Sequence, residues 1–206
     1  MYSSRPGLVL GFHGCDESTL KDVLLKNRQL RTSSNTYDWL GHGIYFWENS
    51  PSRALEYAKL LAKHPRSAGA SIKKPAVLGA VIDLGFCLDL LDHQNLSNVR
   101  DAYDILRETV DKSDFTLPKN KSTKSSGSDI LIRDLDCAVF ETLHKVRDSQ
   151  SLKSFDSVKG VFWEGKPLYQ DAGFRDKDHI QVCVRNPNCI KGYFIPRKLN
   201  SKFDPV

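Results

Sequence analysis

Short apolar runs, bounded by turn residues, recur along the chain and predict buried strands. The runs cover residues 7–12, 43–46, 75–84, 160–163, 179–184 and 189–195. They gather toward the two ends of the chain, which leaves the middle for other structure. The pattern therefore predicts a sheet built from segments that are distant in sequence.

Between these runs, apolar residues recur every three or four positions, which predicts amphipathic helices. Asp16, with Glu17 and Ser18 after it, offers a cap for a first helix, and Ser50-Pro51 offers a cap and first residue for a second. Because helices and strands do not alternate regularly, the class is α+β and a doubly wound sheet is excluded. The expected helices begin near residue 17 and span 51–63, 92–111 and 131–146, with loops at 31–42 and over the Lys- and Ser-rich residues 112–128.

The chain has 206 residues, enough for one domain with a sizeable core, and we assign residues 1–206 to a single domain. A net charge of +5 permits a nucleic-acid partner without requiring one. Five cysteines show no paired spacing and no CxxC, so we expect reduced, buried thiols and no metal site. The N-terminus lacks a signal-peptide pattern, and no apolar run approaches the roughly 20 residues of a membrane span. We therefore expect a cytoplasmic protein without a membrane partner.

Two segments carry candidate chemistry. The first is His13-Gly14 at the end of the first strand, and the second is the aromatic, Gly-containing stretch 37–47. Rings beside glycines suit a flat ligand, because the rings stack on it and glycine lets the backbone approach closely. The glycine motifs of dinucleotide-binding and P-loop folds are absent, as are the nucleophile elbow and the kinase motifs.

The order His13-Gly14, helix, loop and Gly43-Ile44-Tyr45-Phe46 resembles the NAD+ pocket of poly(ADP-ribose) polymerases and related ADP-ribosyltransferases. The resemblance covers residues 8–60 well and becomes faint until the C-terminal strands. It implies an ADP-ribosyltransferase-like split β-sheet core with flanking helices. It also implies NAD+ as a substrate, bound without a metal.

The resemblance assigns roles to residues at the matching positions. His13 would bond a hydroxyl of the adenosine-side ribose, and the backbone of Gly14 would hold the nicotinamide carboxamide. Tyr45, which follows Gly43 in the second motif, and Tyr57 would enclose the nicotinamide ring. Arg53 stands where the polymerases usually carry a small Ser, which changes the expected carboxamide contacts.

The family's third element is a Glu that opens a late strand and stabilises the cationic transition state. Here Gln181 falls at that position, with Glu164 as a second candidate for the missing carboxylate. A neutral amide makes long polymer synthesis unexpected. The preceding loop selects the acceptor in this superfamily, and here it offers Tyr169, Phe174 and Arg175 for stacking or for gripping a phosphate.

The leading hypothesis is a mono-ADP-ribosyltransferase that cleaves NAD+ and transfers ADP-ribose to a macromolecule, with nucleic acid favoured over protein. Its size and charge resemble bacterial toxin or phage-defence members, for which an antitoxin would be a further partner. One alternative is an NAD+ glycohydrolase with the same pocket. Others are a non-enzymatic module that binds NAD+ or ADP-ribose, or an unrelated α+β protein whose two motifs arise by chance.

Overall fold

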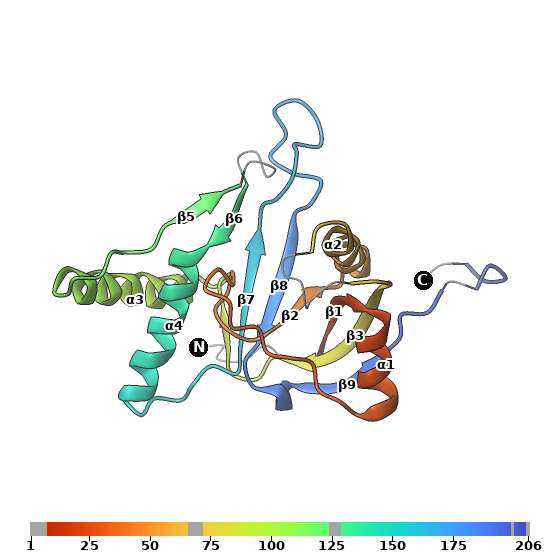
Figure 1. Ribbon diagram of the computed structural model, residues 1–206, viewed down its shortest axis with the longest axis horizontal. Coiled ribbons are helices and arrows are strands. Elements are labelled where there is room, and N and C mark those ends of the chain that lie inside the picture. The colour runs from red at the N-terminus through yellow and green to blue at the C-terminus, as the bar shows by residue number, and fades with distance from the viewer. Residues whose placement is uncertain (1–7, 66–71, 124–128, 199, 205–206) are drawn as a thin grey trace.

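Figure 1 shows a computed structural model of the protein, which describes residues 8–65, 72–123, 129–198 and 200–204. It is an α+β fold in which strands from both ends of the chain share one sheet. The sheet has seven strands in the order β4-β7-β8-β2-β1-β3-β9, and all neighbours are antiparallel except β4 and β7. The strands of this sheet are β1 (Leu8–Asp16), β2 (Ile44–Glu48), β3 (Pro75–Asp83), β4 (Cys87–Asp89), β7 (Ser157–Phe162), β8 (His179–Val184) and β9 (Ile190–Phe194).

Four helices cover the two faces of this sheet: α1 (Glu17–Lys26), α2 (Pro51–Lys63), α3 (His93–Asp111) and α4 (Asp134–Ser149). Helix α1 buries Leu20 and Val23 against one face, together with Phe46 and Val182. The other face is covered by α2 over β1–β3 and by α3 and α4 over β4, β7 and β8. Three apolar clusters therefore form the core, one beneath α1 and two on the opposite side.

The local signals mark the starts of α1 and α2, but only the first of the two expected side-chain caps forms. Asp16 is the N-cap of α1, and its carboxylate accepts from the Ser18 N–H at 2.9 Å. Pro51 is the first residue of α2, but the Ser50 side chain makes no capping hydrogen bond. The expected helix over 92–111 is α3, with Asp92 as its N-cap.

The expected loop over 112–128 and the helix from residue 131 were wrong in part. The strands β5 (Asn120–Ser122) and β6 (Ile130–Arg133) pair antiparallel, and α4 begins only at Asp134. Residues 124–128 of the expected loop lie outside the described residues. Asn120 explains this boundary, because its side-chain oxygen accepts from the N–H groups of Leu135 and Asp136 at 3.0 and 3.2 Å. A cap supplied from another strand leaves no signal next to the helix it caps.

The sheet is continuous, whereas the resemblance implied a split one. Its shortest junction is between β1 and β2, where only Gly11↔Glu48 and Phe12↔Trp47 are paired. By contrast, β1 pairs with β3 along its whole length from Leu8 to Asp16. The β1–β2 ladder therefore opens toward the C-terminal end of β1, next to His13 and Gly14.

A buried ion pair crosses the sheet between β2 and β7. The Lys159 Nζ lies 2.6 Å from Glu48 Oε2, and the two side chains are 5% and 12% exposed. The alternation of the strands places both on the α1 face. Removal of one partner from such a pair leaves an uncompensated charge in the interior.

Glu48→Gln is therefore expected to lower the free energy of unfolding by about 3–5 kcal/mol in urea denaturation. The matched control is Lys26→Gln, which removes an exposed partner of Asp22 and should cost under about 1 kcal/mol. Replacing both charges, with Glu48→Leu and Lys159→Met, should recover most of the loss. Equal, small effects of Glu48→Gln and Lys26→Gln would show that the buried pair does not stabilise the fold.

Candidate functional site

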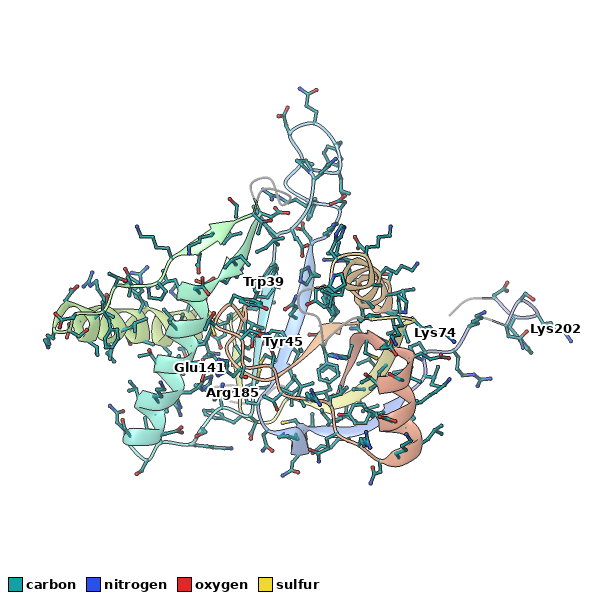
Figure 2. The ribbon with its side chains drawn as sticks, viewed as in Figure 1. Trp39, Tyr45, Lys74, Glu141, Arg185 and Lys202 are labelled. Carbon is teal, nitrogen blue, oxygen red and sulfur yellow. The ribbon has the colours of Figure 1, made fainter. Side chains whose placement is uncertain are left out.

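Three sets of contacts hold the loop before β2, and this loop positions the aromatic-rich stretch 39–47. Gly43 bridges to Ser33, and the buried Asp38 carboxylate accepts from the Ser33 hydroxyl and the Asn35 N–H. Glu141 of α4 accepts from the His42 N–H at 2.8 Å and from Arg185 at 3.0 Å. Figure 2 labels Glu141 and Arg185 near Tyr45. The loop is therefore a rigid support for Tyr45.

His13 and Tyr45, which lie 32 residues apart in sequence, meet where the β1–β2 ladder ends. The His13 Nδ1 lies 2.8 Å from the Tyr45 carbonyl oxygen, so Nδ1 carries the proton and donates it. Burial lowers the pKa of His13 and outweighs this bond, which keeps the ring neutral. Its Nε2 is consequently an acceptor.

Beyond Phe12, the edge of β1 that faces β2 is not paired with it. The Leu10 carbonyl accepts from the Asn49 N–H at 2.9 Å, which sets the alternate residues Leu10, Phe12 and Gly14 with their backbone groups toward β2. Gly14 and Tyr45 would form the next pair after Phe12↔Trp47, but the pairing stops before them. The Gly14 backbone thus faces the opening with a donor and an acceptor.

Packing requires glycine at both motif positions. A Cβ on Gly14 would collide with the Ala54 carbonyl of α2, and a Cβ on Gly43 would collide with the Cys183 Sγ of β8. These contacts explain the two glycines without a ligand. Only Gly14 also lies at the open edge of the ladder.

The Tyr45 hydroxyl is fully engaged. It donates to the Gly41 carbonyl at 2.6 Å and accepts from the Leu40 N–H at 2.8 Å. Burial raises the pKa of Tyr45 well above its ordinary value. A role in proton transfer is excluded at neutral pH, so only the ring remains for contact with a ligand.

Gln181 lies on the α2 face, opposite Trp47 on one side and Gly160 on the other. Its amide nitrogen is 2.9 Å from Nε2 of His179, a residue that no sequence motif had indicated. His179 Nδ1 lies 2.7 Å from the Lys177 carbonyl and must donate to it, so Nε2 accepts. The amide nitrogen of Gln181 is therefore the donor, and its oxygen is turned away as a fixed acceptor.

Glu164 and Arg53 join this group. Arg53 Nη2 lies 2.9 Å from Glu164 Oε2, and the same oxygen is 3.8 Å from His179 Nδ1. Burial raises the pKa of Glu164, more than Arg53 and Lys177 lower it. The structure thus places Gln181 and Glu164, the two candidates for the family's third element, beside His179.

Two buried donors on this side have no hydrogen-bond partner among the described residues. They are the Trp47 indole Nε1 and the Arg53 Nε. Trp47 also contacts Tyr57 of α2, with ring centroids 5.0 Å apart. An unpaired buried N–H is unfavourable by about 1–3 kcal/mol, so both groups call for an acceptor.

The acceptor-loop candidates lie apart from this cluster. Tyr169 and Phe174 are 64% and 67% exposed on the β7–β8 loop, which projects at the top of Figure 1. Arg175 is held at 3.0 Å by Asp129, so its guanidinium is already neutralised. Their contact with an acceptor stays a prediction.

His13 lies on the face opposite Gln181. Phe12 and Trp47 are paired on the α2 face, so His13 points to the α1 face, where its ring is 5.8 Å from that of Phe46. The structure therefore does not bring His13 and Gln181 together on one face of the sheet.

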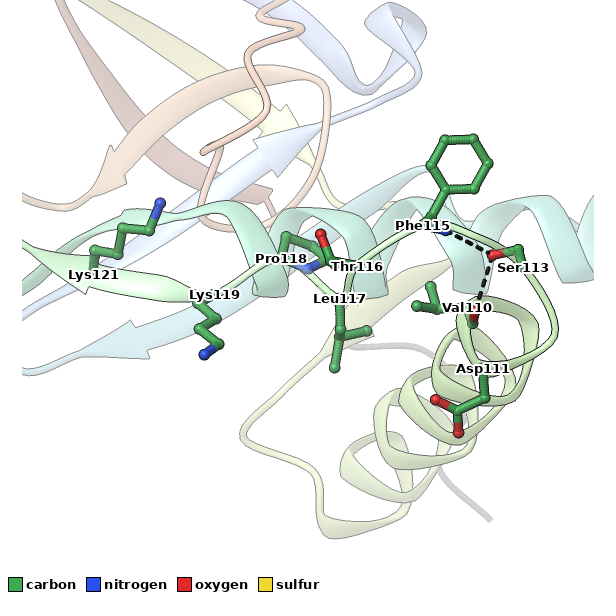
Figure 3. A pocket seen from close by; sticks show the side chains of 9 residues that line it. All are labelled: Val110, Asp111, Ser113, Phe115, Thr116, Leu117, Pro118, Lys119 and Lys121. Atoms are coloured by element: carbon green, nitrogen blue, oxygen red, sulfur yellow. Dashed lines mark hydrogen bonds between the residues drawn. The ribbon is translucent and has the colours of Figure 1, made fainter.

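Two cavities lie elsewhere. One of about 790 Å³ follows α3 and is lined by residues 110–121, with Lys119 and Lys121 at one end and the Phe115 ring directed away from the helix (Figure 3). The other, of about 560 Å³, lies between α3, α4 and β7. Neither includes His13, Gly14 or Tyr45. Within the described ranges, no group of three or more His, Cys, Asp or Glu could hold a metal, and no helix is long and apolar enough to cross a membrane.

No family model and no solved structure matches the chain. The chain is 22% identical over 198 residues to the uncharacterized protein MJ0359 of Methanocaldococcus jannaschii. The match covers 87% of this chain and 83% of the archaeal protein. A protein of similar length thus exists in an archaeon, and its name describes no activity.

The buried histidines predict a pH-dependent stability. Burial lowers the pKa of His179 and of His144 from 6.5 to about 4. The unfolded chain therefore takes up protons below about pH 6.5 that the folded chain refuses until about pH 4, so stability is full above this window and is lost as pH falls through it. The loss should be on the order of 3 kcal/mol for each histidine.

His144→Leu should remove one histidine's share of that loss, measured by urea unfolding at several pH values between 7 and 4. The matched control is His93→Leu, which replaces an exposed histidine on the first turn of α3. An unchanged slope in His144→Leu would contradict a neutral, buried His144.

Proposed function

We propose that this protein cleaves NAD+ as a mono-ADP-ribosyltransferase and passes ADP-ribose to a macromolecular acceptor, with nucleic acid favoured over protein. The observation that carries the proposal is the meeting of His13, Gly14 and Tyr45 at the end of the β1–β2 ladder. Two motifs that resemble one NAD+ pocket in sequence are thus neighbours in space.

The hydrogen-bonding groups at the opening complement the polar groups of NAD+. The neutral His13 Nε2 would accept a hydrogen bond from a ribose hydroxyl. The Gly14 N–H and carbonyl would bond the oxygen and the amide of the nicotinamide carboxamide. The unpaired donors of Trp47 and Arg53 suit the negatively charged pyrophosphate.

In the reaction, the bond between ribose C1′ and the nicotinamide nitrogen breaks, and the electron pair leaves with neutral nicotinamide. An acceptor nucleophile then bonds C1′ and loses its proton. Gln181 would accept from a hydroxyl of the nicotinamide ribose through its fixed amide oxygen, which is the partially negative end of a dipole near the cationic centre. Because an amide carries no full charge, transfer of a single unit is proposed rather than polymer synthesis.

Nicotinamide release from NAD+ tests the proposal, with RNA, DNA or cell lysate added in turn. We expect nicotinamide to be released only when an acceptor is added, and we expect the ADP-ribose label to appear on the added RNA, DNA or lysate component. Release with stoichiometric free ADP-ribose and no addition would make the protein an NAD+ glycohydrolase. Saturable NAD+ binding without release would make it a binding module.

His13→Ala and Gln181→Ala are each expected to lower nicotinamide release about 100-fold or more, because each removes a fixed hydrogen-bond partner of the transition state. His93→Ala, on an exposed helix start, serves as the matched control and should retain full activity. Thermal unfolding of all three variants checks that they fold. Full activity in His13→Ala would contradict the pocket assignment.

His179 is assigned as a positioning residue that holds the Gln181 amide. His179→Leu is expected to reduce kcat about 10- to 100-fold with little change in KM for NAD+, because the amide is then free to rotate. His179→Gln retains an acceptor near the Nε2 position and should restore part of kcat. Equal loss in both variants would indicate a structural role only.

A further inference from the structure

The cavity between α3, α4 and β7 combines aromatic side chains with positive charge that Asp136 neutralises only in part. Its volume is about 560 Å³, within the range of small-molecule sites. Trp39, Tyr103 and Phe162 supply aromatic walls, and Arg100 and Arg133 supply cationic groups. This composition differs from that of a core packing defect, which would be apolar throughout.

The aromatic wall is held in place. The Trp39 indole donates to the Leu131 carbonyl at 3.0 Å, and its ring lies 4.8 Å from that of Phe162. The Arg133 guanidinium covers both rings, at 4.3 Å from Trp39 and 4.9 Å from Phe162. Trp39, Phe162 and Arg133 therefore form one preformed layer at the cavity, in which the guanidinium already lies on both rings.

The charge at the cavity is only partly neutralised. Arg133 donates through Nε to the Ile130 carbonyl and through Nη1 to Asp136, while Nη2 has no hydrogen-bond partner among the described residues. Asp136 is also bonded by Asn120. Arg100 is exposed on α3 and forms no ion pair within the described part of the chain. Two arginines thus offer N–H groups for an anion.

We propose that this cavity binds a nucleotide, with the base between Tyr103 and the layer of Trp39, Phe162 and Arg133, and the phosphate at the guanidinium edges of Arg133 and Arg100. Aromatic stacking accounts for a planar base, and guanidinium groups are suited to phosphate oxygens. A peptide or a lipid could bind to the apolar walls. Neither would account for aromatic side chains and arginines lining the same cavity.

The cavity adjoins the candidate site. Gly160, which lines the cavity, is the cross-strand partner of Gln181, and Phe162 stacks on His179 with centroids 5.7 Å apart. The identity of this nucleotide rests on the proposed function. If that function holds, the bound nucleotide is the residue of a nucleic acid that accepts ADP-ribose. Nucleotide binding itself does not depend on NAD+ cleavage.

Calorimetric titration of the full chain with AMP, GMP, CMP and UMP tests the proposal, with adenosine as the probe that lacks phosphate. Saturable binding of at least one nucleotide is expected, with adenosine weaker. Arg133→Gln should weaken nucleotide binding about 10- to 100-fold, because it removes a charged hydrogen bond. Leu96→Trp, which enlarges a half-exposed side chain at the cavity wall, should also block binding.

Arg28→Gln is the charge-matched control, because Arg28 pairs with Asp22 beside α1 and lies outside the cavity lining. It should bind like the parent. Absence of binding by all four nucleotides, or binding that both Arg133→Gln and Leu96→Trp leave unchanged, would overturn the proposal.

A competition arm distinguishes two sources of the nucleotide. Binding that persists in His13→Ala and under saturating NAD+ would support an acceptor nucleotide. Displacement by NAD+, with loss of NAD+ binding in Arg133→Gln, would support the adenylate half of NAD+ as occupant. Because these readouts are binding heats, they remain informative if no nicotinamide is released.

Discussion

One hydrogen bond fixes the centre of this molecule: the His13 Nδ1–H donates to the Tyr45 carbonyl where the β1–β2 ladder ends. Had the ladder continued, that carbonyl would face the Gly14 N–H. The His13 side chain donates to the Tyr45 carbonyl in place of the Gly14 N–H. Three features of the site accompany this bond. The tautomer of His13 is set, the backbone edge of Gly14 faces the opening, and β2 is still held in the sheet by β8.

The surrounding structure limits how this opening can be used. Helix α2 packs closely on Gly14, where an added Cβ would collide with the Ala54 carbonyl. On the α2 face, Gln181 is oriented by His179, whose neutral ring is in turn fixed by the Lys177 carbonyl. Acceptors and unpaired donors are thus set in place before any ligand binds, which lowers the ordering required on binding.

Much of the fold followed from the sequence because its signals are local. Asp16, Pro51 and the apolar runs of β1, β3 and β8 mark their own elements. The pairing of β5 with β6 and the late start of α4 did not follow, because Asn120 acts across 15 residues on Leu135. The site shows the same division. His13, Tyr45 and Gln181 were selected by motif, whereas His179 and Trp47 act through cross-strand neighbours. Because side chains two residues apart in a strand share a face, the positions of Gln181 and Tyr45 in the sequence could have indicated His179 and Trp47 as their neighbours.

The central claim is that nicotinamide binds at the open edge of β1. Titration of nicotinamide into 15N-labelled protein, followed by amide chemical shifts, tests this most directly. The account predicts that the largest shifts occur at Gly14, with smaller ones at Tyr45 and Trp47. Absence of shifts at Gly14 under saturating nicotinamide, or shifts confined to another part of the chain, would contradict it.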